Sequence, residues 1–533
     1  MATSTQPDLD RSSCIHTVES EAERFVFHSG EQFVWEGLPR GSRVIYSPPP
    51  LPALPDPAAA IADALDHPLG ADPLSAQLRP GMKVTIAFDD ISLPLPPMRS
   101  PDIRRMIIEQ LLDRLAKAGV DDVHLIVAIA LHRKMTASEL REILGPKIFD
   151  AHWPKRLYNH DAEDPAGNVL LGVTEKQEEV WINKRVAESD LLIYVNINLV
   201  TMDGGHKSIN TGLTTYRTIR HHHNVHTLMH CKSYMDPAAS MLQRTCERMG
   251  KIVAEHVKSF HIETTVNTNA FPPLFAYLQK QERHWSGFDT LNFHANRIGL
   301  QVLPYEVKRR IWMSQRSPYG LTSVQAGQTD LVHERTVANV VRQQAVPVKG
   351  ASDIVVMGIP YLCPYNVNSI MNPLLQWVNS VGYGFNLYRG QPLVRKGGVL
   401  IFTHPLYNRF NRTHHPSYVE FFERVLPETR DPAVMEQKYE REFAENEQYR
   451  KMYREGSAYH GVHPFYMWYW GIYGAAWCGK IIAVGGDAFV AGRLGFATAP
   501  SIKEAIEQAR DVVGPSPSIS CFHWPPLILC DVT

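Results

Sequence analysis

Short apolar runs alternate with amphipathic segments along most of the chain. The runs at 83–88, 123–130 and 190–197 contain few polar residues, as is typical of strands that are covered on both faces. A helix is predicted from residue 101 to 117, with proline in its first turn. Another begins where Thr136 and Glu139 form a capping box, and Gly145 is expected to end it.

The second half repeats this alternation. Strands are predicted at 353–358, 398–403 and 480–484, and helices near 367–380, at 432–455 and at 502–511. The pattern predicts an α/β fold with two α/β domains, mostly parallel sheets and an active-site cleft between the domains. The boundaries predicted are an N-terminal domain at 1–348, including an extension and connector at 1–62, a C-terminal domain at 349–515 and a tail at 516–533.

Composition narrows the class of protein. The 533 residues carry a formal net charge of −1, and no basic surplus favours nucleic acid or a membrane surface as a partner. The seven cysteines form no C-x-x-C pair, which favours reduced thiols in a cytoplasm. The uncharged aromatic run at 464–479 is shorter than the roughly 20 residues of a spanning helix. We therefore expect a cytoplasmic enzyme.

Candidate chemistry gathers between Asp203 and His230. Gly204 and Gly205 allow a close approach of backbone to ligand, and Lys207 follows as a covalent anchor or anion-binding group. A run of three histidines at 221–223 offers metal ligands. Further polar residues, Asp89, Asp90 and His132, follow predicted strands, so we expect one crevice to gather them.

Several motifs in order resemble the lactate racemase family of nickel-pincer-nucleotide enzymes. They are ADALDHPLGADPLSAQLRPGMKVTIAFDDISLPLP (63–97), AIALHRKMTASELREILG (128–145), YNHDAED (158–164), DGGHKSINTG (203–212), TIRHHHN (218–224), VQAGQTDLVHE (324–334) and LGFATAPSIKEAIEQA (494–509). The resemblance implies a racemase or epimerase that acts on a 2-hydroxy acid or a related hydroxyl-bearing carbon by reversible hydride transfer. Its partners would be that small hydroxy acid and, transiently, the enzymes that make the cofactor.

The resemblance also implies roles for individual residues. Lys207 would hold the nickel-pincer nucleotide covalently, His223 would be the nickel ligand with His222 as its alternative, and His132 would be a general base. The cofactor would also contact a second set of residues, which are Asp89, Asp90, Ser92, Gly204, Gly205 and Trp468. Square-planar N/S coordination suits nickel, and imidazole suits transfer of a hydroxyl proton.

The chain departs from the family pattern at four places. Leu93 replaces an arginine, Thr211 replaces a proline, and a glutamine and a lysine are missing where Ile370, Met371 and Leu374 align. The region of the family's second catalytic histidine holds only Asn196, Ile197 and Asn198. Asp203 or His206 is the expected replacement on that face of the substrate. The lost cations are groups that would bind a carboxylate or phosphate.

Two other functions remain open from the sequence. The spacing of His222, His226 and His230 places them on one stripe if a single helix spans them, which predicts a zinc or iron site in a metal-dependent hydrolase or lyase. A non-catalytic relative that binds its ligand as a sensor is the other.

Overall fold

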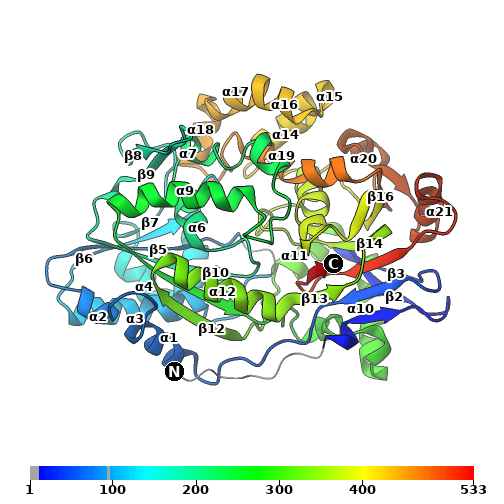
Figure 1. The fold of residues 1–533 in the computed structure, drawn as a ribbon, viewed down its shortest axis with the longest axis horizontal. Helices are drawn as coiled ribbons and strands as arrows, with labels where there is room; N and C mark the ends of the chain where they lie inside the picture. The colour runs from blue at the N-terminus through cyan, green and yellow to red at the C-terminus, as the bar shows by residue number, and fades with distance from the viewer. Residues whose placement is uncertain (1–10, 93–95) are drawn as a thin grey trace.

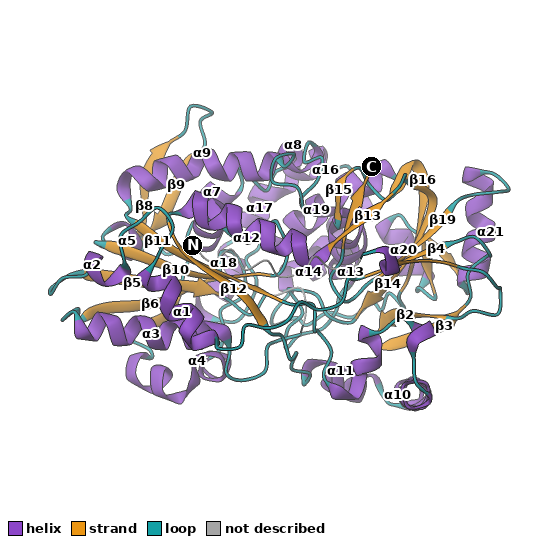
Figure 2. Cartoon of the chain, turned by 60° about the horizontal axis from the view of Figure 1, so that its bottom comes forward, coloured by secondary structure: helices purple, strands orange, loops and turns teal. Residues whose placement is uncertain are grey.

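The computed structural model describes residues 11–92 and 96–533, which build two large sheets side by side (Figures 1 and 2). The first sheet has the strand order β12-β11-β10-β5-β6-β7, parallel except for β12. Its strands are β5 (Lys83–Asp89), β6 (Asp122–Ala128), β7 (Leu157–Asn159), β10 (Leu191–Asn198), β11 (Ser259–Val266) and β12 (Leu321–Gly327). The runs predicted at 83–88, 123–130 and 190–197 are three of them.

Helices cover both faces of this sheet because its strands are apolar on both sides. Leu125 and Ile193 share a core with α3 (Ile103–Lys117) and α4 (Ala137–His152). Ile126 and Leu192 instead pack with α6 (Gly205–Gly212) and α9 (Met241–His256). The capping box that opens α4 is present. The first helical stretch of α4 ends at Gly145 as predicted, because the φ of 75° and ψ of 161° there are not helical, and a second stretch continues to His152.

The second sheet has nine strands, in the order β1-β4-β19-β14-β16-β17-β18 with β2 on β14 and β3 on β2. They are β1 (Ile15–Thr17), β2 (Phe25–Gly30), β3 (Gln32–Glu36), β4 (Arg43–Tyr46), β14 (Ser352–Pro360), β16 (Val394–Thr403), β17 (Lys480–Val484), β18 (Ala497–Ala499) and β19 (Ile519–His523). Most pairs are parallel, and β1–β4 and β2–β3 are antiparallel. The predicted fold class, α/β with mostly parallel sheets, is confirmed.

Two chain ends belong to this second sheet, contrary to the sequence interpretation. Residues 15–46 were expected to extend the N-terminal domain, but β4 pairs with β19 and β2 pairs with β14 (Figure 2). Residues 516–533 were expected to form a tail, but β19 is an inner strand, and β20 (Leu529–Val532) lies between β13 (Ala345–Val348) and β15 (Tyr388–Gly390). Their apolar side chains, such as Val44 and Cys521, are fully buried between helix and sheet. The two-domain boundaries themselves stay a prediction.

The helix predicted at 432–455 is broken into α16 (Pro432–Met435), a π-helical turn (Glu436–Glu440), α17 (Arg441–Ala444) and α18 (Glu447–Glu455). The break has a local cause, because the Asn446 side chain accepts a hydrogen bond from the Tyr449 amide and so caps a new helix. The aromatic run forms α19 (His463–Trp477), buried along most of its length. It packs against α13 (Pro373–Trp377) and the π-helical segment Val378–Gly384 that continues it.

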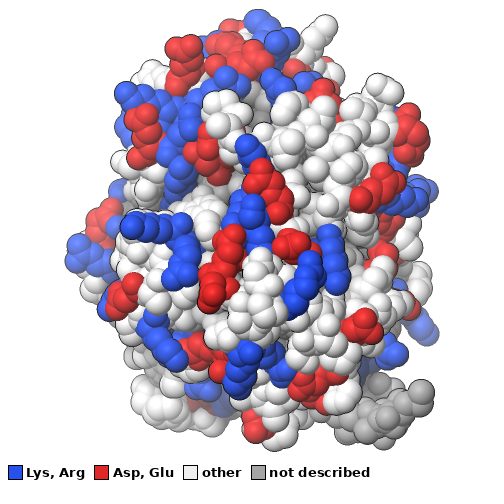
Figure 3. Space-filling model, turned by 90° about the vertical axis from the view of Figure 1, so that its left-hand side faces the viewer, with Lys and Arg blue, Asp and Glu red and all other residues white. Residues whose placement is uncertain are grey.

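The remaining elements connect and cover these sheets. They are α1 (Pro57–Asp66), α2 (Leu74–Gln77), β8 (Asn168–Val173), β9 (Glu179–Asn183), α5 (Lys184–Ala187), α7 (Tyr216–Ile219), α8 (Val225–Met229), α10 (Gly287–Val302), α11 (Tyr305–Met313), α12 (Thr329–Gln344), α14 (Pro416–Glu420), α15 (Leu426–Glu428), α20 (Ala488–Leu494), α21 (Ile502–Val513) and short 3-10 or π turns at 12–14, 273–279, 282–284 and 421–425. Acidic and basic side chains are interspersed on the face shown in Figure 3. None of the helices in the described ranges is long and apolar enough to span a bilayer.

Candidate active site

A cavity with about 1170 Å³ of empty space, part of it open to solvent, lies where the carboxyl ends of β5, β6 and β10 face the second half of the chain. This is the edge where parallel sheets usually bind ligands. Eight of the residues singled out from the sequence line it, namely Asp89, Asp90, Ser92, His132, Asp203, Gly204, Lys207 and His223. Four others, Gly205, His206, His222 and Trp468, do not line it.

Asp90 and His132 form an oriented pair at the ends of β5 and β6. The imidazole Nδ1 donates a hydrogen bond of 2.9 Å to Asp90 Oδ2, and the Ser92 amide and hydroxyl donate to the same carboxylate. Burial alone raises the pKa of Asp90, but His132 and Ser92 more than offset it, so that the pKa lies below its usual value. With Nδ1 committed to the carboxylate, the Nε2 lone pair of His132 is the one available to take a proton.

Lys207 lies in the first turns of α6, on the floor of the cavity. Its Nζ donates to the Met202 carbonyl at 2.8 Å and lies 3.7 Å from Asp203 Oδ1. Burial raises the pKa of Asp203, and Lys207 and backbone amides only partly offset that rise. The ammonium therefore has one weak ionic partner and no tight ion pair, which leaves its nitrogen accessible for covalent chemistry.

His222 determines which ring nitrogen of His223 carries the proton. The Nε2 of His222 must donate to the Asn210 carbonyl, 3.1 Å away, because a carbonyl only accepts. Burial lowers the pKa of His222 to about 4, so its Nδ1 carries no proton and accepts from His223 Nδ1 at 2.7 Å. Burial also lowers the pKa of His223 well below its usual value. His223 thus presents an unprotonated Nε2 to the cavity, the form in which imidazole binds a metal.

A hydrogen-bond network around Asp89 occupies the region where the family has its second catalytic histidine. Its carboxylate accepts from the Asn196 side chain and from the Ile197 amide, and Ser208 in turn donates to Asn196 at 2.6 Å. Burial raises the pKa of Asp89 to about 7 despite these donors. Asn196 and Ile197 line the cavity, and an amide and an alkyl group supply no base there.

Gly204 and Gly205 precede Lys207, and each position requires glycine for a different structural reason. Gly204 has a φ of 92° and lines the cavity. A Cβ at this position would lie 2.3 Å from the side-chain nitrogen Nδ2 of Asn198. Gly205, at a φ of 60°, donates its amide to Glu263 at 2.6 Å and packs against His333. The expected ligand approach at Gly205 is wrong, because that glycine faces the packed interior.

Two other expected site residues point elsewhere. His206 forms an ion pair with Asp330 at 2.9 Å, on the side of α6 away from the cavity. Trp468 stacks on Trp377, with ring centroids 3.8 Å apart, because that side of α19 faces α13. Trp470, two residues later on the helix, lines the cavity instead. The expectations of a base at His206 and a cofactor lid at Trp468 are therefore wrong in placement.

The proposed histidine stripe does not exist. His222 is buried in the turn between α7 and α8, whereas His226 and His230 are exposed, with rings 4.4 Å apart. Residues 11–92 and 96–533 contain no group of three or more histidine, cysteine or acidic side chains placed to hold a metal ion. The prediction of a zinc or iron site on this stripe is wrong, because Asn224 caps a second helix and turns the chain.

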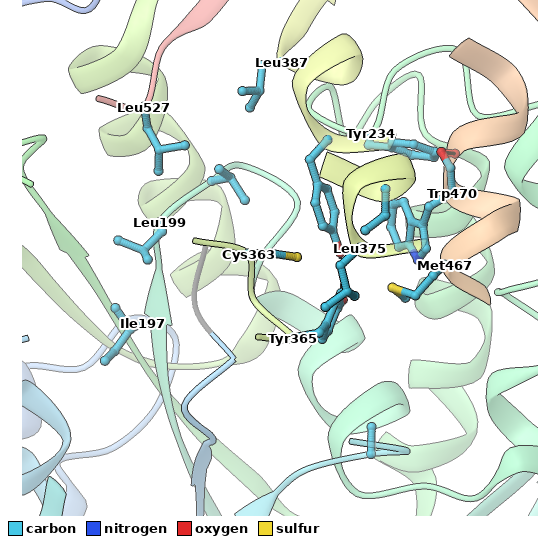
Figure 4. Close-up of a cluster of buried hydrophobic side chains, with 14 of the residues drawn as sticks. Ile197, Leu199, Tyr234, Cys363, Tyr365, Leu375, Leu387, Met467, Trp470 and Leu527 are labelled. Carbon is cyan, nitrogen blue, oxygen red and sulfur yellow. Dashed lines mark hydrogen bonds between the residues drawn. The ribbon is translucent and has the colours of Figure 1, made fainter. Parts of the chain in front are cut away.

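Sequence reasoning missed the wall contributed by the second half. Tyr365 and Tyr383 line the cavity and share a hydrogen bond of 2.7 Å, and Trp524 and Leu527 come from the supposed tail. Figure 4 shows Ile197 and Leu527 on one side, with Tyr365 and Trp470 on the other. No spacing rule marks these residues in the sequence. Among the departures, Thr211 lines the cavity, Ile370, Met371 and Leu374 do not, and Leu93 lies outside the described residues.

Similarity to known proteins agrees with this geometry. Residues 38–236 match the family model described as the lactate racemase N-terminal domain. A lactate racemase from Lactiplantibacillus plantarum is 28% identical over 169 residues, which covers 31% of this chain and 38% of that protein. The aligned part is thus well under half the length of that relative.

Two solved structures share the fold. The lactate racemase apoprotein from Thermoanaerobacterium thermosaccharolyticum superposes with a TM-score of 0.61 at 16% identity, over 95% of this chain and 100% of that one. A protein from Thermotoga maritima superposes with a TM-score of 0.51 at 15% identity, over 89% and 98%. The matched segment, residues 38–236, carries Asp90, His132 and Lys207, and in this part the chain is similar to the N-terminal domain of lactate racemases.

Proposed function

We propose that the chain is an isomerase, a racemase or epimerase that inverts a hydroxyl-bearing carbon with a nickel-pincer nucleotide held on Lys207. The observation that carries this proposal is the convergence of Lys207, His223 and the Asp90–His132 pair on one cavity. These residues come from four separate segments of the chain, and each matches a different motif of the family. The lactate racemase name belongs to the relative and gives no substrate for this chain.

The residues present fit such a cofactor. A pincer ligand fills most of the coordination sphere of nickel itself, so the protein needs to supply one donor, and His223 presents an unprotonated Nε2. Lys207 Nζ is a reachable nucleophile in the same cavity. The indole of Trp470 and the carboxylates of Asp89 and Asp203 line the cavity too, and both kinds of group favour a flat cation such as a pyridinium.

His132 supplies the proton transfer. Its Nε2 takes the proton of the substrate hydroxyl, and Asp90 stabilises the imidazolium that forms and holds the ring in place. A nucleotide held by Lys207 and His223 would supply the electron-poor ring needed for hydride transfer at the carbinol carbon. Burial of the surrounding wall excludes water and protects the carbonyl compound until the hydrogen returns.

Intact-protein mass spectrometry with metal analysis tests the assignment. Protein made together with the cofactor-synthesis enzymes is expected to carry an added mass of several hundred daltons on Lys207 and one nickel. Lys207→Ala is expected to lose both, whereas Lys232→Ala, at an exposed lysine, keeps both. An unmodified Lys207 in the co-produced protein would rule the proposal out. If the protein carries the Lys207 adduct and nickel but inverts no hydroxyl compound, the result would favour the non-catalytic sensor alternative.

A further inference from the structure

The cavity is short of positive charge. Among its described lining residues Lys207 is the only lysine or arginine, whereas three carboxylates, Asp89, Asp90 and Asp203, face the same space. The undescribed ranges 1–10 and 93–95 contain no lysine or arginine either. Once Lys207 is consumed as a covalent tether, no side-chain cation of fixed charge remains in the lining.

The guanidinium groups nearby are already committed. Arg104 donates to both the Asp102 carboxylate and the backbone carbonyls of Asp89 and Asp90. Arg133 makes a two-bond pair with Glu139. Both are almost fully buried, and moving either one would leave a buried carboxylate unpaired, which costs several kcal/mol. Neither is free to meet a substrate anion.

The rest of the wall is apolar or neutral. Its apolar side chains include Val200, Met202, Met235, Leu387, Trp524 and Leu527, of which Figure 4 labels Leu387 and Leu527. Neutral hydrogen-bonding groups come from Asn379 and from the Tyr365–Tyr383 pair. Burial raises the pKa of both tyrosines well above the usual value, so they stay uncharged phenols that bind a carbonyl or hydroxyl group.

We propose that the substrate is an uncharged secondary alcohol with an apolar substituent, and not a 2-hydroxy carboxylate. A carboxylate placed here loses its hydration and gains no bidentate partner. An alcohol that inverts through its ketone gives one proton to His132 and two electrons with one hydrogen to the acceptor, and both return. Such a cycle consumes no other reagent. The inference rests on the function proposed above.

Amides and acids of similar shape separate the effect of the substrate's charge from the effect of its size. Mandelamide and mandelate, and lactamide and lactate, would be offered to the cofactor-loaded enzyme. Binding is read by calorimetry and loss of optical purity by chiral chromatography. We expect each amide to bind at least tenfold more tightly than its acid, and mandelamide to bind more tightly than lactamide. Equal or weaker binding of the amide in both pairs would overturn the inference.

A variant that adds charge gives an independent measure. Leu527→Lys is expected to shift the amide-to-acid preference at least tenfold toward mandelate, whereas Leu527→Met leaves the preference unchanged. An unchanged preference in Leu527→Lys that still folds, judged by its melting temperature, also counts against the inference. The mass of Lys207 is measured on the same samples. A missing adduct defeats the proposed function, whereas an adduct together with acid preference defeats only the substrate class.

Discussion

At the scale of single residues, the site depends on how protons are fixed by neighbours. Asp90 holds Nδ1 of His132, and His222 holds Nδ1 of His223. Each pair leaves one Nε2 lone pair facing the cavity. The sequence indicates His132 and His223 by motif, but only their neighbours determine which nitrogen is available.

Asp90→Asn is expected to lower kcat by about a thousandfold or more. The asparagine turns its NH2 toward His132, which moves the imidazole proton to Nε2 and removes the base. Asp122→Asn, at a half-exposed carboxylate on the far end of β6, is the control and should keep full activity. Steady-state kinetics on the loaded enzyme measures both, and a loss below tenfold in Asp90→Asn would argue against this orienting role.

His222→Leu is expected to weaken nickel retention about 10- to 100-fold, as is typical when the partner of a metal-binding histidine is lost. Without its acceptor, the proton of His223 no longer stays on Nδ1. The matched control is His226→Leu, which removes an exposed histidine five residues after His221. Metal content after dialysis is the measurement. Equal retention in the two variants would contradict the relay.

At the scale of elements, periodicity identified most strands and helices, since β5, β10, β17 and α21 lie close to their predicted ranges. It failed where a local cap or kink intervened. Asn446 ends one helix and begins another, and Asn224 does the same in the histidine run. One capping asparagine barely changes the hydrophobic periodicity of the sequence. It nevertheless starts a new helix, which changes the direction of every side chain that follows.

Gly204→Ala tests the loop that delivers Lys207. Gly204 has a φ of 92° and a ψ of −168°, a region where alanine costs about 1–3 kcal/mol. Its Cβ would also overlap the Asn198 side chain, which adds about 1–3 kcal/mol. Gly81→Ala is the matched control, because its φ is 78° and the space around it is open. Urea denaturation should show the larger loss in free energy of unfolding for Gly204→Ala. Equal losses would mean that the loop adapts.

At the scale of the whole molecule, a buried acid, Glu440, joins α7 in the first half of the chain to α19 in the second. Glu440 accepts hydrogen bonds from Tyr216 in the first half at 3.2 Å and from Tyr469 on α19 at 3.1 Å. Burial, together with Glu436, raises the pKa of Glu440 to about 7. The folded chain therefore keeps a proton there that the unfolded chain releases at lower pH.

The sign of the pH dependence follows. Between about pH 4.5 and pH 7 the folded state binds more protons at Glu440 than the unfolded state, so its contribution to stability falls as pH rises. Glu440→Gln keeps an uncharged side chain that still forms hydrogen bonds. Between pH 5 and pH 7.5 its free energy of unfolding should therefore fall by about 1–3 kcal/mol less than that of the wild type. Denaturation at pH 5 and pH 7.5 measures the difference, with the exposed Glu455→Gln as control. Parallel slopes for Glu440→Gln and wild type would refute it.

The sequence by itself determined the α/β class, the family motifs and the segments that carry Asp90, His132, Lys207 and His223, because periodicity and motif spacing are local. Tertiary structure alone decided that the chain ends pair with strands of the second half and that Trp470 and not Trp468 meets the cavity. It also revealed the shortage of cations. Helix rotation, strand pairing and the charge around a cavity depend on contacts between residues hundreds of positions apart.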